Sequence, residues 1–283
     1  MNNSPLAIGF MKLRKNKLAI FGLIMLTLLT LAAVFAPLLA THERDKTNLR
    51  EMYAPPSKEH ILGTDELGRD VYTRLIYGAR VSLSVGLFST AIATLIGVTL
   101  GSVAGYFGGI IDGIIMIVVD IFMCFPFFVI AIVVAAIMGP SVWNVIVITG
   151  ILTWPTIARI VRAEVLSIRE KEFVEAARAL GLTPIQIIIR HIIPNTLGVT
   201  IVFATLGVAH GILSEAGLSF LGLGVKQPMS SWGNMLAAAQ SVRSLTLHWW
   251  LWVPSGLLVV ATILSINFLG DGLRDALDPK QLR

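Results

Sequence analysis

Three carboxylates stand inside apolar stretches of this 283-residue chain. Asp112 and Asp120 belong to an apolar run at 110–137, and Glu215 belongs to a run at 197–217. An acid at mid-membrane depth costs about 2.5–3.5 kcal/mol on insertion scales, so each should face protein or water. Asp120 lies deeper than Asp112 and leaves two functions open, a proton relay or an ion pair within a helix bundle. We favour the structural pairing.

Other patterns that could support chemistry are absent from the sequence. His210 and Glu215 lie five residues apart, on well-separated helix faces, and no Cys, His or acid cluster joins them. The segment 60–71 is acidic and glycine-rich but lacks the order of a calcium loop. The chain contains no Gly-Lys dipeptide, hence no phosphate-binding Walker A loop, and no nucleophile elbow or dinucleotide fingerprint. We therefore expect no catalytic residue, metal or cofactor in this chain.

The composition is that of a membrane protein. Hydrophobic residues make up 55% and charged residues 14%, whereas a soluble domain has about 25% charged residues. The mean hydropathy is +0.79. The net charge of +5 includes no basic stripe interleaved with aromatic residues, so nucleic acid is not an expected partner. The lone Cys124 excludes an intrachain disulfide.

The apolar runs predict an all-α polytopic protein with six transmembrane helices. The first run, 18–40, carries no charge and is roughly 34 Å long as a helix, which exceeds a signal-peptide core. Five more runs are predicted to form a helical core within 81–270, namely 81–106, 110–137, 142–160, 197–217 and 249–270. Pro126 is expected to kink the third. The remaining segments are an N-terminal tail (1–17), an external linker (41–80) and a C-terminal tail (271–283).

The basic residues orient the chain. An even number of spans puts both termini on one side, and four basic residues before the first span predict that this side is the cytoplasm. They are Lys12, Arg14, Lys15 and Lys17.

Glycines recur at every fourth position in the second and fifth runs, which places them on one helix face. Missing side chains let another helix approach closely. We expect close packing within the bundle or against another subunit; lining of a substrate groove is the alternative. The glycines concerned are Gly97, Gly101, Gly105, Gly109, Gly207 and Gly211.

The cytoplasmic loop 163–196 predicts two short helices joined at a glycine corner. Ser167 and Glu170 form a capping-box pattern that predicts a helix start. Gly181 is placed to end that helix in the left-handed region. Thr183 is expected to cap the next helix, with Pro184 in its first turn, and Pro194 to end it before the fifth span.

The spacing of this loop resembles the EAA signature of ABC importer permeases, with His191 at a position that is usually aliphatic. Segments 60–71 (HILGTDELGRDV) and 219–236 are similar to segments of the same family, although Ile61 replaces a usual proline. Together the resemblance covers about 10–280 and identifies the chain as similar to the C-type permease subunit of dipeptide/oligopeptide ABC importers. The matching residues of the signature are Glu175, Ala176, Ala177, Gly181, His191, Ile193 and Pro194.

The resemblance implies a type I ABC importer permease fold in a bacterial or archaeal cytoplasmic membrane. It also implies a sister permease, two ABC ATPase subunits that hold ATP and Mg²⁺, and an extracytoplasmic solute-binding protein. The loop would dock on an ATPase as a coupling helix, with the small Ala176 and Ala177 permitting close contact. The coupling residues would be Phe173, Glu175, Ala176, Ala177, Ala179, Leu180 and Gly181.

Two questions stay open at this stage. Asp65, Arg69 and Asp70 form either a salt-bridged helix start or a contact with an external partner. The cargo is expected to be a peptide, with a nickel chelate or an oligosaccharide as alternatives within the family. Outside the family, the alternative is an ion-coupled secondary transporter.

Overall fold

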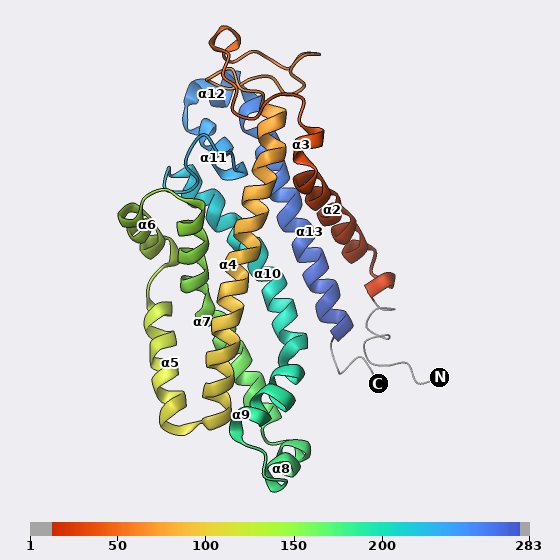
Figure 1. Ribbon diagram of the computed structural model, residues 1–283, viewed down its shortest axis with the longest axis vertical. Coiled ribbons are helices and arrows are strands. Elements are labelled where there is room, and N and C mark those ends of the chain that lie inside the picture. The colour runs from red at the N-terminus through yellow and green to blue at the C-terminus, as the bar shows by residue number, and fades with distance from the viewer. Residues whose placement is uncertain (1–12, 278–283) are drawn as a thin grey trace.

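The protein is a bundle of long helices, described by a computed structural model over residues 13–277 (Figure 1). No strand occurs within 13–277. The N-terminal part comprises α2 (Lys17–Val34), α3 (Ala36–Leu39), α4 (Val71–Phe107), α5 (Gly109–Cys124), α6 (Phe127–Met138) and α7 (Val142–Ile168). The remainder comprises α8 (Glu172–Ala179), α9 (Pro184–Ile187), α10 (Ile193–Phe220), α11 (Trp232–Leu236), α12 (Val242–Leu247) and α13 (Val253–Leu277).

Five helical stretches are long and apolar enough to cross a membrane, or six if one bent pair counts as a span. The bent pair is α5 and α6, which meet at an angle of 84°. Pro126 lies in the break and is the N-cap of α6. Its ring removes a backbone donor and fixes its φ, which explains why the apolar run predicted as one span is broken there.

Three predicted helix boundaries were wrong: the start of α4, the end of α7 and the stop at Pro194. Helix α4 begins at Val71, ten residues before the expected start, because Asp70 caps it by accepting a hydrogen bond from the Thr73 amide. Helix α7 continues past residue 160 to Ile168, so Ser167 lies inside its last turn instead of starting a helix.

The predicted stop at Pro194 was also wrong. Pro194 lies at the start of α10 directly after a π-helical turn, and the helix continues past it although proline has no amide to donate. Helix α9, a π-helical segment (Ile188–Ile192) and α10 follow one another without a break, so that Pro184–Phe220 forms one apolar stretch.

Helix α4 is the central element and packs most extensively against α7 and α10. A Cβ added to Gly97 would lie 2.7 Å from Ile157 Cβ, and one on Gly101 would lie 2.5 Å from the Ala158 carbonyl oxygen. These distances require glycine, because no Cβ tolerates them. Gly105 meets α7 at Val165, while Gly207 and Gly211 of α10 approach α4 at Thr90 and Gly86.

Gly109 does not belong to this packing stripe. A Cβ there would meet nothing within 4 Å, and its φ is +54°. With Gly108 it forms the turn between α4 and α5, so this glycine serves the backbone conformation and not a helix contact.

The two ends of the bundle differ. The first residues of α2 and the last residues of α13 lie toward the same end as α8, whereas the segment 41–70, α11 and α12 cover the opposite end (Figure 1). The predicted basic residue Lys12 lies outside the described residues, as do positions 278–283 of the predicted C-terminal tail.

Candidate coupling and transport sites

Helix α8 is a short helix with a defined end. The amide of Gly181 donates to the Arg178 carbonyl oxygen (2.9 Å), and the amide of Leu182 donates to the Ala177 carbonyl oxygen (3.2 Å). This pair of bonds is a Schellman motif, which requires a left-handed residue at its corner. Gly181 has a φ of +80°, and no atom lies within 4 Å of a Cβ built on it. The corner at Gly181 therefore has the conformation that the sequence predicted.

The next helix begins as predicted too. The hydroxyl of Thr183 accepts from the Gln186 amide, and the Gln186 side chain accepts from the Thr183 amide, which completes a capping box. Pro184 occupies the first turn. The two short helices are thus held at a fixed corner.

One face of α8 is buried in its own bundle. Val174 and Ala177 belong to a hydrophobic cluster that includes Val165 and Ile168 of α7 and Ile187 of α9. Ala177 is only 4% exposed, so we revise the expectation that it contacts another subunit; it packs α8 onto the bundle. The exposed residues are Phe173, Glu175, Ala176, Ala179 and Leu180.

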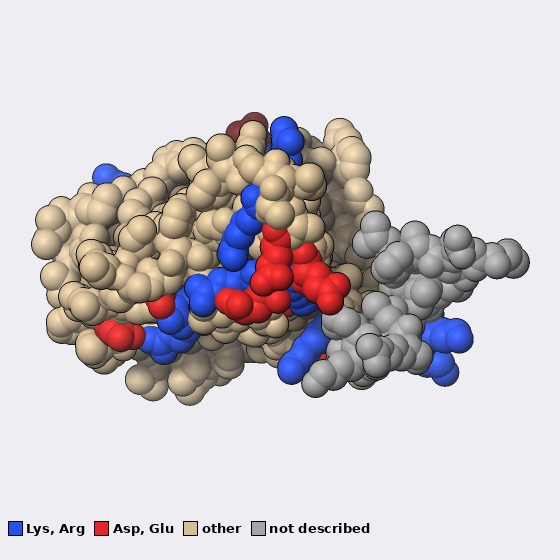
Figure 2. All heavy atoms as spheres, turned by 90° about the horizontal axis from the view of Figure 1, so that it is seen from below, with Lys and Arg blue, Asp and Glu red and all other residues tan. Residues whose placement is uncertain are grey.

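Polar contacts also hold α8 and the segment before it against the end of α4. Arg169 donates to the Gly105 carbonyl oxygen of α4 (3.1 Å), and the Arg178 guanidinium lies 5.3 Å from the Tyr106 ring centroid. His191 replaces the usual aliphatic residue and places its ring 6.4 Å from that of Phe173. Seen from this end, acidic and basic side chains form a band across an otherwise uncharged face (Figure 2).

Asp112 and Asp120 of α5 pair with arginines of α7. Asp112 forms an ion pair with Arg162, and Asp120 accepts from Arg159 at 2.6 Å. The side chains of Arg159 and Asp120 are 49% and 64% exposed. An exposed charged pair on membrane helices needs water or another subunit over it, so this face of α5 and α7 is not one that lies against lipid.

Glu215 is fully buried and lies where α4, α10 and the start of α11 meet. Its two carboxylate oxygens accept from the hydroxyls of Ser82 (2.8 Å) and Ser219 (2.7 Å). Those hydroxyls in turn accept from the amides of Trp232 (3.1 Å) and Val225 (3.1 Å). The carboxylate is therefore the last acceptor of two short chains of hydrogen bonds that tie the loop after α10 to the bundle.

A cavity of about 300 Å³ lies between α4, α7 and α10. Hydroxyl groups and one imidazole provide its polar lining, and the Thr149 hydroxyl is buried without a hydrogen-bond partner in the described residues. The surface of the cavity is nevertheless mainly apolar, with Ile157, Phe203 and Leu206 among its lining residues. Its polar residues are Ser89, Thr90, Thr149, Thr153, Thr156 and His210.

At the opposite end, Asp65 and Arg69 are directed into the fold. Asp65 accepts from Arg69 (2.7 Å) and lies 3.4 Å from Arg74, while Arg69 also donates to Gln227 (2.9 Å). Arg69 and Asp70 are each 3% exposed, so the geometry favours a structural helix start over a contact surface for an external partner.

Sequence reasoning missed the arginine partners of the membrane acids. Arg159 and Arg162 were assigned to or next to the loop, because α7 was expected to end at residue 160. A helical projection continued to Ile168 puts both on one side of α7, three residues apart, which was the available signal. Of the two serine partners of Glu215, Ser82 comes from a distant segment and carried no such signal, whereas Ser219 lies four residues later in the same helix.

The fold and these sites define a multi-pass membrane permease. Residues 97–283 match the family described as binding-protein-dependent transport system inner membrane component, and residues 4–56 match the N-terminal TM domain of oligopeptide transport permease C. The chain belongs to the binding-protein-dependent transport system inner membrane component family, the permease component of ABC transporters, which is not itself an enzyme.

Two relatives indicate the range of similarity. The chain is 46% identical to the dipeptide transport system permease protein DppC of Alkalihalophilus pseudofirmus over 278 residues, covering 98% of this chain and 90% of the relative. The inward-facing MetNI methionine ABC transporter matches with a TM-score of 0.57 at 21% identity, covering 72% of this chain and 96% of that chain. The latter supports the type I permease fold that the sequence predicted.

Proposed function

We propose that this chain is one of two permease subunits of an ATP-driven importer of dipeptides or oligopeptides. The cargo assignment is supported by the similarity to a dipeptide permease over nearly the whole chain. A solute-binding protein would deliver the peptide from outside, and the sister permease would cover the exposed Asp120–Arg159 pair.

The single observation that carries the coupling role is the way α8 joins the bundle. Its inner face is part of one hydrophobic cluster with α7, and its outer face exposes Phe173 and Leu180. A helix fixed in this way transmits a displacement to α7 without bending at the joint. ATP-driven closure of two ATPase subunits would then shift the bundle between two states of alternating access.

The carboxylate of Glu175 suits the same role. It is exposed in the first turn of α8 and forms no ion pair within residues 13–277. A positively charged side chain of the ATPase subunit would form an ion pair with this carboxylate. ATP and Mg²⁺ belong to that subunit, and no step of hydrolysis is assigned to this chain.

An ion-coupled carrier is a weaker candidate. Such a carrier needs a carboxylate that gains and loses a cation, whereas Asp120 is paired with Arg159 and Glu215 already accepts from two hydroxyls. Neither group is placed to change its partner without a rearrangement of α5 or α10.

The test is ATP-driven peptide uptake by proteoliposomes that contain the assembled transporter, with Gly181→Val. Valine in the left-handed region imposes strain of about 1–3 kcal/mol, so the corner should open. We expect uptake per ATP hydrolysed to fall about 5–150-fold, the range of ordinary coupling energies. Gly139→Val is the matched control, because Gly139 has nearly the same φ (+78°) and equally open surroundings. Equal loss in both variants, or unchanged uptake with Gly181→Val, would contradict the coupling role.

A further inference from the structure

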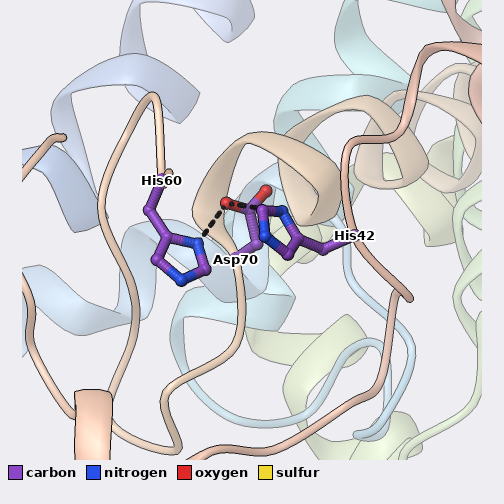
Figure 3. Close-up of side chains that lie close together, drawn as sticks. All are labelled: His42, His60 and Asp70. Atoms are coloured by element: carbon purple, nitrogen blue, oxygen red, sulfur yellow. Dashed lines mark hydrogen bonds and ion pairs between the residues drawn. The ribbon is translucent and has the colours of Figure 1, made fainter. Parts of the chain in front are cut away.

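Two histidines and one aspartate converge at the end of the bundle opposite α8. His42 follows α3, His60 lies in the loop before α4, and Asp70 is the N-cap residue of α4. One nitrogen from each ring and one oxygen of the carboxylate lie within 4.8 Å of one another. Figure 3 shows both imidazoles directed at the same carboxylate from different segments of the chain.

The distances are those of a metal-ligand set. His60 Nδ1 lies 2.9 Å and His42 Nδ1 lies 3.5 Å from the same atom, Asp70 Oδ2. Ligand bonds of about 2.0–2.2 Å in a tetrahedron separate neighbouring ligand atoms by roughly 3.3 Å. The distances of both ring nitrogens to Asp70 Oδ2 lie within about half an ångström of this value, and the two nitrogens are within 4.8 Å of each other.

The surroundings favour a cation. The nearby arginines Arg69 and Arg74 pair with Asp65, so no arginine compensates Asp70. The other carboxylate oxygen, Oδ1, accepts from the Thr73 amide (2.7 Å), which fixes the orientation of the group. Asp70 is 3% exposed, and its Oδ2 meets only imidazole nitrogens among the described residues.

His60 also has the outer partner that metal-bound histidines use. Its Nε2 lies 3.4 Å from Glu51 Oε2, and Asn48 donates to the same oxygen (2.7 Å). A carboxylate that accepts the second ring proton fixes the tautomer with Nδ1 free to bind a metal and raises its basicity. Glu51 is therefore an outer partner that orients His60 and is not itself a metal ligand.

We propose that His42, His60 and Asp70 form a binding site for a divalent transition metal, with Zn²⁺ the ion whose preference for nitrogen and oxygen ligands they fit best. The His42 side chain is 31% exposed, which leaves room for water as the fourth ligand. The ion joins the segment after α3 to the loop before α4 and to the first turn of α4. The imidazoles bind as neutral donors, and the carboxylates of Asp70 and Glu51 balance the two positive charges of the ion.

Zinc binding by the full-length chain tests this site directly. The protein is purified in detergent without a polyhistidine tag, loaded with Zn²⁺, and passed over a chelating resin before elemental analysis. Wild type should retain one Zn²⁺ per chain, and His42→Gln, at a partly exposed position, should retain none. His60→Gln should behave alike. His191→Gln, which removes a histidine at the opposite end, should retain zinc as wild type does.

Two further variants discriminate the ligand set from its neighbours. Glu51→Gln should weaken Zn²⁺ affinity about 10–100-fold in competition with a chromophoric chelator, as expected of an outer partner. Glu59→Gln should leave it unchanged, although Glu59 belongs to a second cluster with Glu51 and His60. The proposal is overturned if wild type retains no more zinc than His42→Gln, or if Glu59→Gln loses zinc while His42→Gln keeps it. Unchanged gel-filtration profiles and helical circular dichroism establish that each variant is folded.

Discussion

Glu215 shows how one buried side chain organises three segments. Its carboxylate accepts from Ser82 of α4 and Ser219 of α10, and each serine is positioned by a backbone amide of the 221–232 region. A buried acceptor with two directed donors is well satisfied, so the group holds its neighbours in place. The loop between α10 and α11 is thereby tied to the centre of the bundle.

Glu215→Gln should destabilise the protein, because glutamine has one acceptor oxygen where the carboxylate has two. One serine hydroxyl would lose its partner, and a buried unsatisfied group costs about 1–3 kcal/mol. Glu215→Ala should cost more, since both serines lose their partner. Thermal unfolding in detergent should give melting temperatures that fall from wild type to Glu215→Gln to Glu215→Ala. A Glu215→Gln variant as stable as wild type would contradict this account.

Individual residues were predictable where a local rule places them. Gly181 and Thr183 follow from helix-capping rules that act over three or four residues. Arg159 beside Asp120 and Ser82 beside Glu215 depend on which helices pack together, and that is a property of the whole bundle. The sequence marks such acids as costly and leaves their partners undetermined.

At the scale of elements, the contact between α4 and α7 depends on side chains that are missing. Gly97 and Gly101 bring the α4 backbone against Ile157 and Ala158. In a membrane, where lipid tails are as apolar as leucine, helices associate through such close packing. The fourfold glycine spacing predicted a packing face, but the sequence alone did not name the partner helix.

Gly101→Ala should therefore destabilise the bundle although alanine is a better helix former. Its Cβ would lie 2.5 Å from the Ala158 carbonyl oxygen, a backbone atom that cannot move alone, and overpacking costs about 1–3 kcal/mol. The matched control is Gly113→Ala in α5, where nothing lies within 4 Å and alanine should be neutral or stabilising by about 0.5–1 kcal/mol. Equal melting temperatures for the two variants would refute the packing argument.

Helix boundaries were less predictable than helix existence. Every apolar run became helical, yet α4 starts at Val71 and α7 ends at Ile168, well outside the uncharged runs. The first charged residue shows where a helix leaves apolar surroundings. The helix itself ends only where its terminal backbone groups find hydrogen-bond partners. Arg74 and Arg162 can lie within the helices because each forms an ion pair with a carboxylate, Asp65 and Asp112 respectively.

At the scale of the molecule, the two ends of the bundle are built differently. One end carries α8 on a hydrophobic cluster continuous with α7, and the other carries hydrogen-bonded loops over the helix starts (Figure 1). The proposed metal site strengthens the second end, and it went unpredicted because His42, His60 and Asp70 have no motif spacing. Only the chain path from α3 to α4 brings them together.

The positive charges near the first span predict that the α8 end faces the cytoplasm. Single cysteines test this in cells, on a Cys124→Ala background that removes the natural thiol. Leu180→Cys places a probe at a residue 81% exposed beside α8, and Ile61→Cys places one at a residue 50% exposed at the other end. A membrane-impermeant maleimide should label Ile61→Cys in intact cells but Leu180→Cys only after permeabilisation. The proposed coupling role requires α8 to meet an ATPase that works on cytoplasmic ATP. Labelling of Leu180→Cys in intact cells would therefore contradict both the orientation and the coupling role.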